Sequence, residues 1–105
     1  MNKHCKSCEG GVKPLNKDQI KNMVAELSGW QASEDYKIIF KNFKFKNFHE
    51  TMKFVNFVAD IANQENHHPD LEVGYNHCLV KYTTHAISGL SENDFICATK
   101  INSKR

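Results

Sequence analysis

Apolar residues recur along the 105-residue chain with two different periods. Between residues 16 and 28, and again between 47 and 66, they return every three or four positions, which is typical of amphipathic helices. Residues 30–45 and 71–83 alternate apolar and polar side chains instead, as strands with one buried face do. A third helical pattern follows residue 91. The order helix, two strands, helix, two strands, helix predicts an α+β domain, with a four-stranded antiparallel sheet and three helices packed on one face.

A residue suited to N-capping starts each predicted helix, and an acid or amide three positions later completes the spacing of a capping box. The pairs are Asn16 with Gln19, Asn47 with Glu50, and Ser91 with Asp94. Turns are expected at Glu34-Asp35 and at Asn76-His77. The aromatic alternation changes parity between positions 40 and 43, which predicts a β-bulge near Lys41-Asn42.

The helix predicted at 47–66 has an unusually broad apolar face. At about 100° per residue, its apolar side chains cover an arc of roughly 220°. That arc is wider than one sheet-facing stripe requires. The helix is therefore either covered on two sides within one chain or shared with a second subunit. The second alternative makes it a candidate interface of a homodimer or tetramer.

Composition narrows the class of protein. The net charge is +2 and the lysines are dispersed, so a nucleic-acid surface has little support. No apolar run approaches the roughly 20 residues that span a bilayer. The first residues lack the apolar core of a secretory signal. We therefore expect a cytoplasmic protein without a membrane partner, whose four cysteines are reduced.

Residues 1–14 are polar and predict an N-terminal arm in front of a domain at 15–105. His4, Cys5 and Cys8 are zinc-ligand types and form a candidate metal site. Tetrahedral zinc requires four ligands, however, and no second Cys/His pair follows at a recognisable spacing. A polar arm without metal is the simpler interpretation.

The candidate chemistry is a group of histidines at the corners of the fold. His67-His68-Pro69 ends the second helix, because a proline restricts the residue before it to extended conformations. His85 ends the last strand, and antiparallel pairing would return it to the same edge as His67 and His68. Imidazoles exchange protons near neutral pH, because their ordinary pKa is about 6.5.

Each of these residues has a structural explanation when taken alone, and Asp94 in particular suits its capping position. A zinc site of three histidines and Asp94 is an alternative. Adjacent histidines do not aim both rings at one ion without strain, so metal-free proton transfer is favoured. Cys78 and Cys97 are not expected to lie beside the histidines, which argues against a nucleophilic thiol.

The spacing of these residues resembles the signature of the pterin-4a-carbinolamine dehydratases. His67-His68-Pro69 is followed by five residues and Tyr75, then nine residues and His85, then eight residues and Asp94. The resemblance covers about residues 15 to 101. Its further carriers are Gly29-Trp30, the aromatic run from Phe40 to Phe48, and Ser88-Gly89-Leu90-Ser91-Glu92.

The resemblance implies the fold described above, assembled as dimers or tetramers. It implies dehydration of 4a-hydroxytetrahydrobiopterin to a quinonoid dihydropterin and water, which links the protein to the cofactor recycling of an aromatic amino acid hydroxylase. It implies no metal and no cofactor. The alternative is a non-catalytic interaction or dimerisation module on the same fold, similar to the transcriptional cofactors among animal members.

The resemblance also implies roles for single residues. His67 and His85 would transfer protons, and His68 would orient the pterin or assist protonation. Asp94 would hold an imidazole in one orientation and tautomer. The residues implied to contact the pterin are Asn63, His68 and Pro69.

Three positions depart from the family pattern. They are Asn63 in place of a charged residue, Leu71 where some members have Trp, and Asn93 in place of Arg. We expect them to change histidine tuning and substrate preference rather than the reaction.

Overall fold

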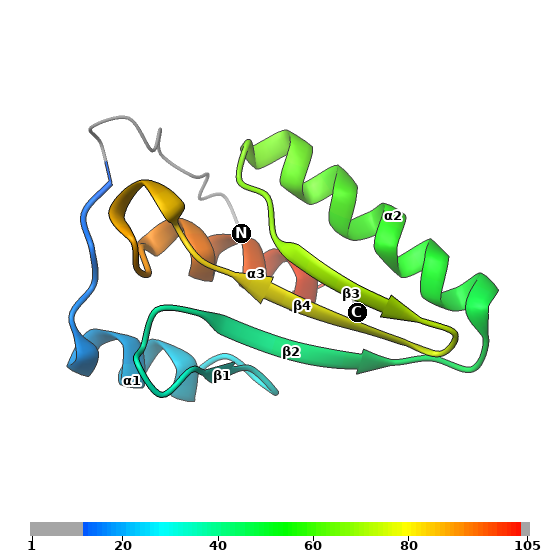
Figure 1. Ribbon diagram of the computed structural model, residues 1–105, viewed down its shortest axis with the longest axis horizontal. Coiled ribbons are helices and arrows are strands. Elements are labelled where there is room, and N and C mark those ends of the chain that lie inside the picture. The colour runs from blue at the N-terminus through cyan, green and yellow to red at the C-terminus, as the bar shows by residue number, and fades with distance from the viewer. Residues whose placement is uncertain (1–11, 104–105) are drawn as a thin grey trace.

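A computed structural model of the chain describes residues 12–103 (Figure 1). The four strands form one antiparallel sheet in the order β1-β2-β4-β3. This confirms the predicted α+β fold and its element order. The elements are α1 (Lys17–Ala25), β1 (Gln31–Ala32), β2 (Ile39–Lys44), α2 (Phe48–Glu65), β3 (Asp70–Gly74), β4 (His77–Tyr82), the short 3₁₀ turn η1 (His85–Ile87) and α3 (Glu92–Ser103).

The core lies between the central strands and the helices. Alternate residues of β4 are fully buried, as the predicted period of two requires. They meet buried residues of all three helices in a single cluster. The strand members are Ile39, Phe43, Cys78, Val80 and Tyr82, and the helix members include Ile20, Phe54, Val58, Phe95 and Ile101. No helix within residues 12–103 combines the length and apolarity needed to cross a membrane.

The predicted bulge at residues 41–42 is wrong. β2 pairs with β4 without interruption from Ile39 to Lys44. Lys41 shares the helix-facing side of β2 with Ile39 and Phe43, while Phe40 faces the other way. The Lys41 ammonium donates to the Ser28 carbonyl at 3.0 Å and lies over the Phe43 ring. Because the sequence has a lysine at this inward-facing position, the apolar alternation looked as if it changed sides there. The aliphatic part of Lys41 packs on the inner face, while its ammonium reaches the Ser28 carbonyl.

Three boundaries also differ from their predictions. The last strand, expected to end at His85, ends at Tyr82, and His85 begins η1. The β3–β4 turn is Tyr75-Asn76, one residue earlier than expected, because Gly74 pairs with His77. Helix α1 ends at Ala25 rather than at residue 28, and the chain continues in tight turn bonds toward Gly29, whose φ is +83°. The predicted turn at Glu34-Asp35 is present between β1 and β2.

Helix α2 begins as predicted. Asn47 caps it by accepting from the Glu50 backbone N–H at 2.9 Å. Its core side is buried through Phe54, Val58 and Ile61. Met52, Val55 and Phe57 remain only half-buried in the single chain. Part of the broad apolar arc thus stays accessible, which leaves the second-subunit alternative open.

Candidate active site

The end of α2 turns one histidine inward and the next one outward. Asn66 adopts the left-handed conformation, with φ 51° and ψ 42°, and ends the helix after Glu65. The following His67 backbone N–H returns to the Ala62 carbonyl at 3.1 Å. His67 is consequently only 6% exposed, whereas His68 is exposed. The helix does end before Pro69 as predicted, but Asn66 makes the turn.

His67 is held on two sides. Its Nε2 lies 2.6 Å from the Asp94 Oδ1, a bond between the end of α2 and the first turn of α3. Its ring stacks on Tyr82 of β4, with 5.5 Å between the centroids and 9° between the planes. The orientation of this imidazole is therefore set by one hydrogen bond and one aromatic face.

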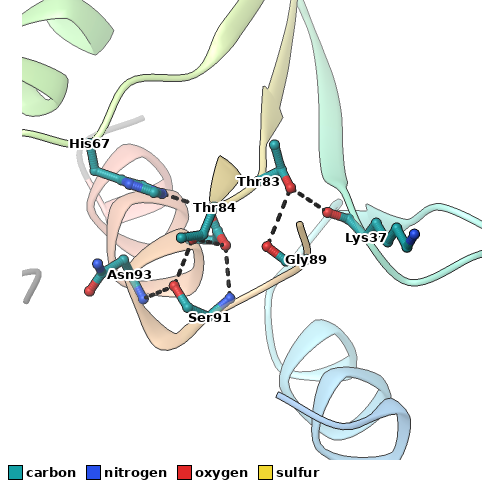
Figure 2. Close-up of polar contacts among 8 residues, drawn as sticks. Lys37, His67, Thr83, Thr84, Gly89, Ser91 and Asn93 are labelled. Atoms are coloured by element: carbon teal, nitrogen blue, oxygen red, sulfur yellow. Dashed lines mark hydrogen bonds and ion pairs between the residues drawn. The ribbon is translucent and has the colours of Figure 1, made fainter. Parts of the chain in front are cut away.

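Asp94 is fully buried and accepts from three donors, on His67, Thr84 and Ser91, which are labelled in Figure 2. Besides His67, they are the Thr84 hydroxyl at 2.8 Å and the Ser91 backbone N–H at 2.9 Å, both on Oδ2. The Thr84 and Ser91 hydroxyls lie 2.7 Å apart. Three donors around one carboxyl group suit its ionised form, which only accepts. We call His67, Thr84, Ser91 and Asp94 the buried polar network.

Two opposing influences set the pKa of His67. Burial lowers it, because a charged imidazole loses hydration. The hydrogen bond and the negative charge of Asp94, with a smaller contribution from Cys97, together outweigh burial, so the pKa of His67 lies above its ordinary value of 6.5. The paired carboxylate therefore favours the charged form of this ring.

The other predicted site residues lie around this network. His68 Nε2 is 3.3 Å from the Asn63 Oδ1, and both residues are exposed. Pro69 is half-buried beside them. His85 is exposed and begins η1, directly after Thr84 of the network in the sequence. The structure thus pairs His67 with Asp94 and His68 with Asn63 at the end of the sheet where β3 begins and β4 ends.

The two remaining departures from the family pattern, Leu71 and Asn93, are half-buried and buried, respectively. Leu71 is half-buried on the inner face of β3, opposite Val80. Asn93 is buried, and its backbone N–H donates to the Ser91 Oγ at 3.2 Å.

Residues 12–103 contain no cluster of side chains suited to bind a metal ion. There, no three His, Cys, Asp or Glu side chains gather closely enough to hold an ion. The zinc alternative of three histidines with Asp94 therefore does not assemble. The other candidate metal site, His4 with Cys5 and Cys8, lies outside the described residues.

Sequence reasoning missed two contributors. Thr84 continues the inward register of Cys78, Val80 and Tyr82, so its hydroxyl enters the core and requires a partner. The alternation of inward-facing residues along β4 could have predicted from the sequence that Thr84 is buried. Cys97, expected to lie away from the histidines, is close enough to His67 to act on its pKa.

Comparison with known proteins identifies the class. The family model described as pterin 4 alpha carbinolamine dehydratase matches residues 13–104. The chain belongs to this family. A protein of Legionella pneumophila (strain Corby) is 60% identical over 101 residues, which cover 95% of this chain and 89% of the relative. A protein of Nitrosomonas eutropha is 57% identical over 99 residues, 93% of this chain and 86% of the relative. Both carry the provisional name pterin-4-alpha-carbinolamine dehydratase.

Solved structures agree with this assignment. A transcriptional coactivator/pterin dehydratase from Brucella melitensis superposes with a TM-score of 0.83 at 31% identity, over 87% of this chain and 97% of that one. A pterin dehydratase-like protein described as a RuBisCO assembly factor in the α-carboxysome shares the fold, with a TM-score of 0.62 at 17% identity, over 71% of this chain and 87% of that one.

Proposed function

We propose that this protein dehydrates 4a-hydroxytetrahydrobiopterin to the quinonoid dihydropterin. Family membership supports the proposal. The observation that carries it is the 2.6 Å bond between the buried His67 and Asp94. The exposed His68 follows His67 in the sequence, and the exposed His85 follows Thr84. The proposed catalytic domain is 15–105, preceded by an arm at 1–14.

The reaction needs an acid and a base. The C4a–O bond breaks as the leaving hydroxyl takes a proton and departs as water. The neighbouring ring nitrogen loses a proton, and its electron pair forms the C4a=N double bond. Acids and bases whose pKa values lie near the working pH transfer these protons best.

The histidines divide this work in the proposal. His67 donates its Nε2–H to Asp94, so Nδ1 is the ring atom left for proton transfer. Because the pKa of His67 is raised, this histidine suits the acid that protonates the leaving hydroxyl. The exposed His85 serves as the base. His68, with Asn63 and Pro69, orients the pterin. No step requires a metal or a cofactor.

The test is a dehydratase assay in which a phenylalanine hydroxylase generates the carbinolamine and ultraviolet absorbance follows its loss. We expect faster decay with the protein, unaffected by a chelator. His67→Ala and His85→Ala should each abolish most of the acceleration, because general acid–base catalysis contributes about 10²–10⁴-fold. Circular dichroism controls for folding. Wild-type turnover in both folded variants would refute these roles, and decay at the uncatalysed rate with the wild type would refute the reaction.

A non-catalytic interaction module is the second candidate function. The half-buried apolar side of α2, with Met52, Val55 and Phe57, favours it. The Brucella relative is named a transcriptional coactivator as well as a pterin dehydratase. Equilibrium dialysis with a reduced pterin separates the two candidates. Failure to bind any pterin, together with a stable complex through α2, would support the module.

The same surface supports a homodimer or tetramer joined through α2, which sedimentation equilibrium would measure. A cytoplasmic location and a functional link to an aromatic amino acid hydroxylase complete the proposal.

A further inference from the structure

The proton order in the buried polar network follows from which atoms can donate. An ionised Asp94 only accepts, so the single hydroxyl hydrogen of Thr84 points to the Asp94 Oδ2 at 2.8 Å. Thr84 Oγ1 must then accept from the Ser91 hydroxyl, 2.7 Å away. Ser91 Oγ in turn accepts from the Asn93 backbone N–H. Every hydrogen in the chain thus points one way, from the start of α3 through Thr84 to the carboxylate.

This order fixes the rotation of the carboxylate. Oδ2 is held by donors from two different elements, namely the Thr84 hydroxyl after β4 and the Ser91 backbone N–H before α3. Oδ1 is thereby left facing His67 at 2.6 Å. Thr84 is itself fixed, because its backbone N–H donates to the Gly89 carbonyl at 2.9 Å and its side chain is buried. The Thr84 hydroxyl therefore fixes Asp94, the partner of His67, relative to the end of β4.

We propose that Thr84 is a positioning residue for the reaction: its hydroxyl, oriented by Ser91, holds Asp94 so that the other carboxylate oxygen stays on His67 Nε2 and leaves Nδ1 for proton transfer. The kinetic part of this inference rests on the proposed function, whereas the structural part concerns His67 alone. The titratable groups beside His67 are Asp94 and Cys97 of α3 and Tyr82 of β4.

Matched variants separate the hydroxyl from the shape of the side chain. Thr84→Val keeps the branched shape and loses the hydroxyl, while Thr84→Ser keeps the hydroxyl. Thr83→Val is the control, because Thr83 is the adjacent residue and its hydroxyl donates instead to the Lys37 carbonyl at 2.6 Å (Figure 2). The control loses a threonine hydroxyl from the same stretch without touching Asp94.

The first measurement needs no substrate. Nitrogen-15 NMR of labelled histidine reports the tautomer and the pKa of His67 as the pH is varied. In Thr84→Val we expect the carboxylate to rotate and its bond to His67 to weaken. Burial, the largest influence on this ring, then lowers the pKa of His67 toward or below its ordinary value. Thr84→Ser and Thr83→Val should titrate like the wild type.

The second measurement is the pH–rate profile. We expect Thr84→Val to lower kcat about 10-fold on the alkaline side, where the acid form of His67 is depleted, with little change in KM. Thr84→Ser should restore the profile.

A Thr84→Val titration of His67 identical to that of Thr83→Val would overturn the proposal, whatever the kinetics. If Thr84→Val does not fold, Ser91→Ala makes the same test, because the Ser91 hydroxyl orients the Thr84 hydroxyl. We then expect a smaller fall in the pKa of His67. An unchanged pKa of His67 in Ser91→Ala would count against the proposal. A wild type without dehydratase activity would refute the proposed function instead, and the titration alone would then decide whether Thr84 positions His67.

Discussion

The charge on Asp94 can be removed with almost no change of shape by Asp94→Asn. Asparagine offers one oxygen and one NH₂ group where the carboxylate offered two acceptors. The Oδ2 side faces two donors, Thr84 and Ser91, so the amide oxygen must lie there. The NH₂ group then faces His67, which can accept only by giving up its Nε2 proton. The variant should fold, with His67 neutral and protonated on Nδ1.

The cost follows from the bonds that lose their charge. Hydrogen bonds to charged groups contribute about 1.5–3 kcal/mol each and neutral ones about 1 kcal/mol, so making the 2.6 Å His67–Asp94 bond neutral should cost about 1 kcal/mol. Because about 1 kcal/mol shifts Tm by roughly 4–8 °C in a domain of this size, the change in this bond should lower Tm by about that amount.

The penalty should depend on pH. The pKa of His67 is raised on folding, so its contribution to stability is fully present below the ordinary pKa of 6.5 and is lost as the pH rises through the higher folded value. Asp94→Asn should therefore destabilise more at a pH of about 6 than at about 9.

Urea unfolding at both pH values, with equal m-values as the two-state check, measures this difference. An equal penalty at the two pH values would contradict the assignment of a charged His67–Asp94 pair.

Two further predictions concern stability, each measured by urea unfolding. Asn66→Ala should cost about 1–2 kcal/mol because of its left-handed φ of 51°, while Asn66→Gly should be nearly neutral; equal losses would assign the cost to the side chain instead. Lys100→Met should cost about 3 kcal/mol, because it removes the ammonium that lies 2.8 Å from the Glu65 carboxylate, whose side chain is 1% exposed. Adding Glu65→Gln to Lys100→Met should recover most of this loss. A double variant as unstable as Lys100→Met alone would argue against the ion pair.

Local rules predicted most of the fold. The Asn16 and Asn47 caps form as expected, because a capping bond joins residues three apart and needs no tertiary information. The buried alternation of β4 also follows directly from its sequence. The errors arose where tertiary contacts decide. Lys41 belongs on the inner face only because Ser28 and Asn102 are there to accept from it.

The candidate site was predictable as a set of residues but not as a geometry. The spacing of His67, His85 and Asp94 indicated the family, yet nothing in adjacent histidines tells which one turns inward. The left-handed Asn66 decides that, and asparagine at a helix end is only a weak signal for it. Ser91 was predicted as a cap, but its hydroxyl bond to Thr84 depends on the packing of α3 against β4.

The C-terminal turn of α3, like its first turn, makes hydrogen bonds to distant parts of the chain. Asn102 accepts from the indole N–H of Trp30 at 3.0 Å and from Lys41 at 3.1 Å, across 72 and 61 residues of sequence. Trp30 is the single tryptophan of the chain. Its fluorescence therefore reports whether the last turn of α3 is docked, while the His67 imidazole signal reports the first turn. An unfolding experiment that follows both signals would distinguish fraying of the last turn from loss of the whole helix.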